Sequence, residues 1–218
     1  MAMGAPLRLH GYHRSSTSYR VRIALNLKRL DHEIVPVNLL AREQRSEAFR
    51  ARNPFAGVPT LEADGVVMAQ SMAILEWLDE RFVERPLLPA GIADRFAARE
   101  LAMGIATELH APLNGPVLEY LKLDLGHAQA EVDIWYWHWL EKTLTAVEAR
   151  LAQRGTGDFL FDGPGYFECV LVPQLYNARR FAFDLAAYPH MTRIEAACLT
   201  DPAFVAAHPD NQPDSPVG

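Results

Sequence analysis

Cysteine is scarce in this sequence of 218 residues, and long apolar runs are missing. Cys169 and Cys198 lie far apart among apolar residues, so the chain offers no disulfide framework, no zinc cluster and no Cys-x-x-Cys redox motif. The eight histidines form no helical ligand pair, and we assign no metal site. No stretch approaches the ~20 apolar residues that cross a bilayer, and the N-terminus lacks a secretory pattern. We therefore expect a cytoplasmic protein without a membrane partner.

Concentrated positive charge is missing as well. The chain has 21 Lys and Arg against 27 Asp and Glu, a formal net charge of -6, and its basic residues are scattered. Because phosphate contacts need clustered Lys and Arg, we do not expect a nucleic-acid partner. What the sequence has is a hydrophobic content of 50%, enough for the core of one large or two small domains.

The first ninety residues alternate between short apolar runs and amphipathic segments. In chain order they predict a strand at 7–11, a helix ending near 28, a strand at 33–39, a helix at 43–52, strands at 58–63 and 66–68, and a helix at 70–81. The first strand, helix and strand imply a parallel pair with a crossover helix. Asp64-Gly65 is a strong signal for a tight hairpin. The predicted order is βαβαββα, the layout of a thioredoxin-like α/β domain.

The segment 86–93 carries two prolines and a glycine, and we place a domain boundary there. Beyond it the apolar period is helical, which predicts an all-α second domain. Its expected helices run from 94 to 123 with interruptions around Pro112 and Pro116, and over 128–151, 167–183 and 189–199. The tail from 208 to 218 is expected to be extended. The predicted domains are residues 1–87 and 93–218.

Four hydroxyl residues, Ser15, Ser16, Thr17 and Ser18, follow the first strand where the first helix begins. A helix N-terminus favours a bound thiolate, carboxylate or phosphate, because its first N–H groups have no intrahelical partner and the dipole is positive there. The alternative is that these residues only cap the helix. A redox-active thioredoxin-like domain would carry cysteines in this turn. Since none is present, a thiolate here must come from a ligand, for which glutathione is the obvious candidate.

Two further pairs follow in the order that such a ligand requires. Val58-Pro59 enters a strand; in this fold such a bond is usually cis, which would expose the Val58 backbone to a peptide ligand, although an ordinary edge-strand proline is the alternative. Gln70-Ser71 begins a helix and offers a second anion site, suited to a γ-glutamyl carboxylate, or else a plain cap. The order and spacing of the three features favour a glutathione site.

These residues carry a family resemblance over nearly the whole chain. The sequence resembles the zeta class of glutathione transferases, which includes maleylacetoacetate isomerase and the bacterial maleylpyruvate isomerases. The matching runs are Arg14-Ser15-Ser16-x-Ser18-x-Arg20-Val21-Arg22, Asn53-Pro54-x-x-x-Val58-Pro59, Gln70-Ser71-x-Ala73-Ile74, Leu171-Val172-Pro173-Gln174 and, in the tail, Gln212-Pro213-Asp214. The Ser-Ser motif and the Gln-Pro-Asp tail are specific to this class, since other classes often use a tyrosine.

The resemblance implies a homodimer of the glutathione transferase fold with glutathione as cofactor. It implies cis–trans isomerisation of a maleyl-type diacid, as in aromatic amino acid catabolism: the thiolate adds to the double bond, the resulting single bond rotates, and elimination returns the thiol. The implied roles are catalysis for Ser15, Ser16 and Thr17, glutathione binding for Val58, Pro59, Gln70, Ser71 and His110, and binding of substrate carboxylates for Arg14 and Arg180. If the resemblance is set aside, Arg14 could equally form a structural salt bridge, and Arg180 would be expected to lie on a solvated helix surface.

The sequence departs from the family at four places. Thr17 replaces the usual cysteine, Phe55-Ala56-Gly57 lacks the usual Gln or Lys, and Pro116 replaces an arginine found in many bacterial members. The usual Thr-x-Ala-Asp helix start reads Gly165-Tyr166-Phe167-Glu168, which keeps part of a capping box. The favoured function is a maleylacetoacetate isomerase. The alternatives are a general glutathione transferase that conjugates electrophiles, a maleylpyruvate isomerase, and a non-catalytic binding protein with this fold.

Overall fold

The structure, a computed structural model, describes residues 6–216 and divides into two compact units. The first unit combines the chain up to Leu88 with the segment from Leu199 onward, and the second is Pro89–Cys198. The N-terminal residues 1–5, part of the stretch inspected for a secretory signal, and the tail residues 217–218 lie outside the described range. Each unit is described by itself below.

The first unit is built on a four-stranded mixed sheet with the order β2-β1-β3-β4. Strand β1 pairs in parallel with β2 and antiparallel with β3, and β3 pairs antiparallel with β4. Its elements are β1 (Leu7–Gly11), α1 (Ser16–Leu27), β2 (His32–Pro36), the 3₁₀ turn η1 (Glu43–Arg45), α2 (Glu47–Arg52), β3 (Thr60–Ala63), β4 (Val66–Ala69) and α3 (Ser71–Arg81). The predicted βαβαββα order is confirmed, although the second helix is shorter because Ser46 caps it and η1 precedes it.

The β3–β4 hairpin has the turn that its sequence predicts. Asp64 and Gly65 both have positive φ, at 50° and 78°. A two-residue hairpin turn needs left-handed backbone at both positions, which Asp tolerates and Gly adopts freely. Leu61 on β3 pairs with Leu9 on β1, and both side chains are fully buried, so the hairpin closes over the core of the unit.

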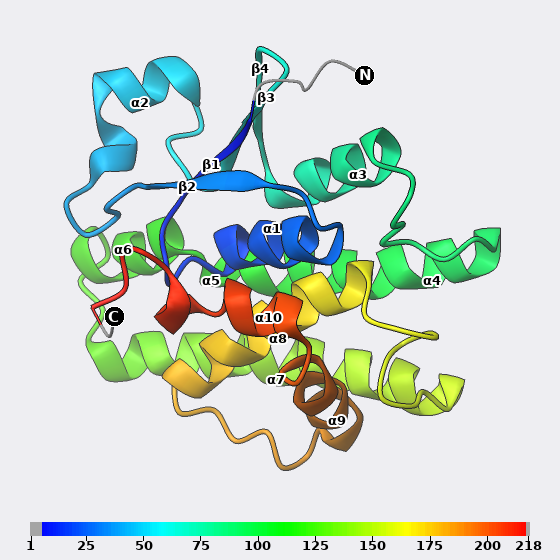
Figure 1. The fold of residues 1–218 in the computed structure, drawn as a ribbon. Helices are drawn as coiled ribbons and strands as arrows, with labels where there is room; N and C mark the ends of the chain where they lie inside the picture. Colours follow the sequence, from blue (N-terminus) through cyan, green and yellow to red (C-terminus); the bar gives the residue numbers. More distant parts are fainter. Residues whose placement is uncertain (1–5, 217–218) are drawn as a thin grey trace. The chain divides into compact units, whose positions relative to one another are not determined.

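The C-terminal segment completes the first unit. Helix α10 (Pro202–Ala207) packs against α1, as Figure 1 shows, and the Asn26 side chain donates to the Ala203 carbonyl at 2.9 Å. These contacts group residues 199–216 with the sheet, whereas the sequence analysis assigned them to the helical domain. Helix α10 has no counterpart among the predicted helices, and residues 209–211 form a 3₁₀ turn, η3 (Pro209–Asn211), where an extended tail is predicted.

The regular elements of the second unit are all helices among its described residues, as predicted. Its elements are α4 (Ile92–Met103), a π-helical segment η2 (Gly104–His110), α5 (Ala111–Leu113), α6 (Gly115–Leu123), α7 (Gln129–Arg154), α8 (Tyr166–Arg180) and α9 (Pro189–Cys198). Helical backbone continues through Pro112 to Leu113 and breaks at Asn114, which caps α6 with Pro116 in its first turn. The predicted interruption is therefore confirmed between the two prolines but not at Pro112 itself, which lies in the first turn of α5, where a missing N–H is tolerated. The π-helical segment is a feature that the periodicity did not predict.

A buried glutamate fixes the start of α8. Glu168 is 2% exposed, and its carboxylate accepts the backbone N–H groups of Gly165 at 2.9 Å and Leu160 at 2.8 Å. Burial raises the pKa of Glu168, although both hydrogen bonds oppose the shift. The predicted half of a capping box at Gly165 is therefore present.

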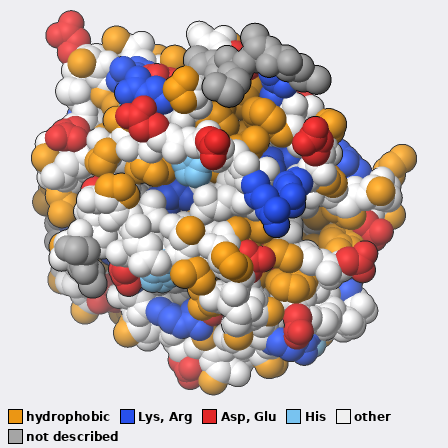
Figure 2. Space-filling model, in the orientation of Figure 1, with side chains coloured by type: hydrophobic (Ala, Val, Ile, Leu, Met, Phe, Trp, Pro, Cys, Tyr) orange, Lys and Arg blue, Asp and Glu red, His pale blue; other side chains and the backbone are white. Residues whose placement is uncertain are grey.

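Two general features bear on partners. Within residues 6–216, no helix is both long and apolar enough to cross a membrane. Basic and acidic side chains are interspersed on the face shown in Figure 2.

Candidate active site

The hydroxyl-rich turn lies at the N-terminus of α1, where the sequence predicts it. Ser15 is the N-cap: its Oγ accepts the Ser18 N–H at 3.1 Å, and its own N–H donates to the Tyr12 carbonyl at 3.0 Å. The first turn of α1 contains no acidic residue to offset the positive end of the helix dipole, although the Asp214 carboxylate accepts the His13 N–H two residues before Ser15. The turn is both a cap and a favourable place for an anion.

Three oxygen atoms connect this turn to the loop before β3. Ser15 Oγ lies 2.9 Å from Thr17 Oγ1, and Thr17 Oγ1 lies 2.9 Å from the Val58 carbonyl oxygen. Because a carbonyl only accepts, the Thr17 proton points to Val58, and the proton between the two hydroxyls comes from Ser15. Ser16 is the first residue of α1 and is only 4% exposed, whereas Ser15 and Thr17 are half-buried.

The loop that carries Val58 is held by one amide side chain. Asn53, 3% exposed, donates from Nδ2 to the Gly57 carbonyl at 2.8 Å and to Thr60 Oγ1 at 3.1 Å. Its Oδ1 accepts the Phe55 N–H at 3.1 Å. The Val58–Pro59 peptide bond is cis, and β3 begins at Thr60. Asn53 and Thr17 thus hold the loop from two sides.

The start of α3 is the place where the sequence predicts a second anion site. Gln70 is exposed and has a φ of 70°, a left-handed backbone that is uncommon for a residue other than glycine. Ser71 begins the helix, and its Oγ accepts a hydrogen bond from Arg20 Nη1 at 3.2 Å. Arg20 is 1% exposed, so a buried guanidinium lies directly behind Ser71. The sequence analysis assigned no role to Arg20; the available signal was a charged residue flanked by the apolar positions Tyr19 and Val21.

Arg14, next to the turn, is held by an aromatic neighbour. Its Nη2 donates to the Tyr12 hydroxyl at 3.2 Å, and its guanidinium carbon lies 5.8 Å from the centre of the Tyr12 ring. The Arg14 Nε is buried and has no hydrogen-bond partner within residues 6–216. Because this atom has almost no contact with solvent, a carboxylate that approaches the turn reaches it only when the guanidinium moves.

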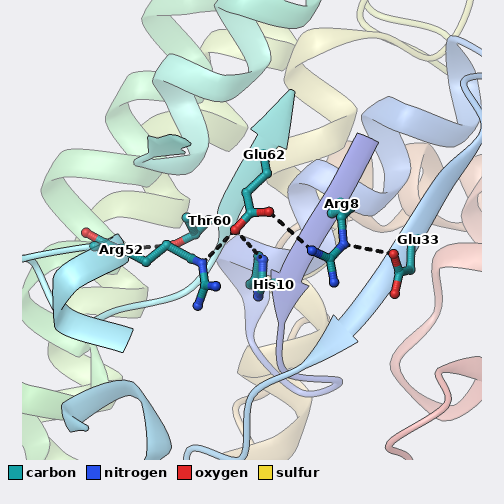
Figure 3. Close-up of polar contacts among 7 residues, drawn as sticks. Arg8, His10, Glu33, Arg52, Thr60 and Glu62 are labelled. Atoms are coloured by element: carbon teal, nitrogen blue, oxygen red, sulfur yellow. Dashed lines mark hydrogen bonds and ion pairs between the residues drawn. The ribbon is translucent and has the colours of Figure 1, made fainter. Parts of the chain in front are cut away.

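A network around Glu62 anchors α2 to the sheet (Figure 3). The Glu62 carboxylate on β3 accepts from Arg52 Nε at 2.6 Å, lies 2.9 Å from His10 Nε2, and accepts from Arg8 Nη1 at 3.5 Å. Burial lowers the pKa of His10. Burial acts to raise the pKa of Glu62, but His10 and Arg52 outweigh it and lower that pKa. Since Arg52 ends α2, the network fixes the point where the Asn53 loop begins.

The remaining predicted residues lie in the second unit. His110 is half-buried at the end of η2. Arg180 is the exposed last residue of α8 and donates to Asn177 Oδ1 at 3.3 Å. Burial raises the pKa of Tyr136, and the charge of Arg180 opposes this rise, so the two side chains interact electrostatically. The exposure of Arg180 fits the alternative of a solvated arginine on a helix surface. A role in ligand binding also remains open, because the contact with Asn177 uses only one of the guanidinium donors.

Among residues 6–216, no three or more His, Cys, Asp or Glu side chains lie close enough together to bind a metal ion. Both cysteines are buried as free thiols.

Comparison with known proteins places these features in a family. Residues 9–86 match the model of the glutathione S-transferase N-terminal domain. The chain is 41% identical over 215 residues to a maleylacetoacetate isomerase of Pseudomonas aeruginosa, covering 97% of this chain and 100% of that relative.

Solved structures agree over the full length. A holo structure of maleylpyruvate isomerase, described as a bacterial zeta-class glutathione S-transferase, superposes with a TM-score of 0.93 at 40% identity, covering 95% of this chain and 99% of that one. A maleylacetoacetate isomerase of Anaeromyxobacter dehalogenans, with dicarboxyethyl glutathione and citrate in its active site, gives a TM-score of 0.86 at 42% identity, covering 97% and 98%. The chain belongs to the zeta class of the glutathione S-transferase family, among the maleylacetoacetate and maleylpyruvate isomerases.

Proposed function

We propose that this protein is a glutathione-dependent cis–trans isomerase of maleyl-type diacids. The observation that carries the proposal is the start of α1, where a hydroxyl cap, on a helix whose first turn has no acidic residue, is tied through Thr17 to the Val58 carbonyl. This turn favours an anionic sulfur but contains no cysteine, so the thiolate must come from a ligand. Relatives at about this level of identity are named as such isomerases, and one binds a dicarboxyethyl derivative of glutathione.

In this proposal glutathione extends from the Ser15 turn to the start of α3. Its sulfur lies at Ser15–Thr17, its peptide backbone follows Val58 and Pro59, and its γ-glutamyl carboxylate meets Gln70 and Ser71. The buried Arg20 behind Ser71 adds positive charge to the carboxylate end. His110 contributes from the second unit, as the family resemblance suggests.

Among the three hydroxyls, we assign the thiolate contact to Ser15. Its oxygen is fixed by the Ser18 N–H, and its proton is donated only to the neutral hydroxyl of Thr17. Rotation of that proton toward a thiolate exchanges a neutral hydrogen bond for a stronger charge-assisted one. The Thr17 proton is directed to a carbonyl, and Ser16 is almost fully buried. Thr17 therefore orients Ser15 and the Val58 loop.

The reaction needs little more than a stable thiolate and cations for the diacid. The thiolate adds to the carbon–carbon double bond and forms an enolate, the new single bond rotates, and elimination of the thiolate restores the double bond as the trans isomer. Arg14 and Arg180 bind the substrate carboxylates and stabilise the enolate charge, since a guanidinium pairs with a carboxylate through two parallel hydrogen bonds.

The test is to incubate the protein with glutathione and maleylacetone and to follow loss of the cis isomer. Glutathione-dependent turnover supports the proposal. Turnover only with a chlorinated aromatic acceptor would favour a conjugating glutathione transferase instead, a reading to which Pro116 lends weight because it replaces a carboxylate-binding arginine of many bacterial members. Failure to bind glutathione by calorimetry would contradict both enzymatic readings. We further propose that the protein acts as a homodimer in the cytoplasm.

A further inference from the structure

The C-terminal segment returns to the turn that precedes α1. The backbone N–H of His13 donates to Asp214 Oδ2 at 2.9 Å, although the two residues are 201 positions apart. His13 is followed directly by Arg14 and Ser15, the residues to which we assign the substrate carboxylate and the thiolate. The tail therefore contacts the backbone of the turn that carries Arg14 and Ser15.

A buried arginine connects the same turn to the end of α10. Arg22, 3% exposed, donates from Nε to the Ala207 carbonyl and from Nη2 to the His13 carbonyl, each at 2.9 Å. Its Nη1 also donates to the Tyr12 carbonyl at 3.4 Å. The N–H and the carbonyl of His13 are thus both bound, one by the tail and the other by α1.

The tail itself is held in a defined conformation. Gln212, 7% exposed, donates from Nε2 to the carbonyls of Ala206 and His208, each at 2.9 Å. The Ser215 N–H donates to the Gln212 carbonyl at 2.9 Å, which closes a turn around Asp214. The Asp214 carboxylate therefore belongs to a folded segment whose own hydrogen bonds fix its position next to His13.

We propose that Asp214 is a positioning residue, and that residues 212–216 form a C-terminal strap that sets the geometry of the Tyr12–Ser15 turn for catalysis. This inference rests on the proposed function for its catalytic part. A charged acceptor forms a stronger hydrogen bond to a backbone N–H than a neutral one, and it constrains the peptide that leads into Arg14. Since small displacements of catalytic groups cost large factors in rate, losing this acceptor lowers turnover without removing any group that touches the substrate.

The experiment compares Asp214→Ala, Asp214→Asn and the control Asp210→Ala. Asp210 directly precedes Asn211 and the strap, is itself exposed, and its carboxylate lies 3.6 Å from the half-buried His208 side chain rather than in a hydrogen bond to the backbone of residues 12–15. We expect Asp214→Ala to lower kcat about tenfold, the loss of one hydrogen bond to a charged group. Asp214→Asn, which keeps an oxygen acceptor, recovers most of that loss, and Asp210→Ala stays within twofold of the wild type.

Two readouts separate positioning from a general loss of folded protein. The pH profile of kcat/KM shifts its acidic limb to higher pH in Asp214→Ala if the displaced turn stabilises the thiolate less, which is opposite to the downward shift that loss of a neighbouring negative charge alone produces. A smaller folded fraction scales the profile without moving it. Amide exchange at residues 12–15 becomes at least tenfold faster in Asp214→Ala and not in Asp210→Ala, whether or not the protein turns over a diacid. Equal effects of the two alanine variants, or an unshifted profile with unchanged exchange, would overturn the inference. Absence of glutathione binding by the wild type would instead count against the proposed function, leaving the exchange result to decide on the strap.

Discussion

Replacing Lys28 by Met removes a buried charge that joins the ends of α1 and α3. The Lys28 side chain is fully buried, and its ammonium donates to Asp79 Oδ1 at 2.9 Å and to the carbonyls of Phe82 and Arg85 at 2.9 and 2.8 Å. Met has a similar volume and no donor, so the substitution tests the electrostatic contribution with little change in packing.

The magnitude follows from what remains after the substitution. Asp79, whose side chain is 5% exposed, keeps hydrogen bonds from the N–H groups of Leu87 and Leu88 but loses its counter-charge. Breaking a buried ion pair by removing one partner costs about 3–5 kcal/mol, because the other charge stays buried. The free energy of unfolding of a whole domain is only about 5–15 kcal/mol, so the loss is a large part of it.

The assay is urea denaturation at pH 7 with a matched surface control. Arg150→Met removes a pair of similar length, 2.8 Å to Glu100, but both side chains are exposed, and we expect a loss below about 1 kcal/mol. The double variant Lys28→Met with Asp79→Asn should be more stable than Lys28→Met alone, because it removes the unpaired charge. If Lys28→Met costs no more than Arg150→Met, the reasoning about this buried pair is wrong.

Three further outcomes are expected. Ser15→Ala should lower turnover by about 10- to 100-fold through loss of a hydrogen bond to the thiolate, whereas Ser16→Ala keeps most of it; steady-state kinetics of both variants checks this, and the reverse order would reassign the donor. Arg180→Met should raise the KM for a diacid about tenfold and leave that for a neutral electrophile almost unchanged, and equal effects would make Arg180 structural. Burial lowers the pKa of His10 in the folded state, so as the pH falls below about 6.5 the unfolded chain binds a proton at His10 before the folded chain does. The free energy of unfolding therefore decreases as the pH is lowered. In urea titrations at pH 7.5 and 5.5, His10→Asn should show a smaller fall than the wild type; an equal fall would exclude His10 as its source.

The parts of the site that the sequence predicts are those governed by local rules. A hydroxyl cap before an apolar period fixes Ser15 at the start of α1. The apolar period alone places Ser71 at the start of α3, because Gln70 is the N-cap there and no side chain caps the helix. The contact between Thr17 and Val58 was not predicted, because 41 positions separate the two residues and no local pattern joins them. Arg20 and Asp214 were given no role because their partners lie 51 and 201 positions away, a separation at which no local pattern gives information.

The discontinuous make-up of the first unit has a consequence for synthesis of the chain. The second unit is inserted between Leu88 and Leu199, so the sheet domain receives α10 and Asp214 only after the whole inserted unit has left the ribosome. Until then the surface of α1 that α10 covers is unprotected, and the N–H of His13 lacks its carboxylate. The Tyr12–Ser15 turn is therefore completed only at the end of translation, and a product that stops before residue 199 lacks both α10 and the Asp214 contact to this turn.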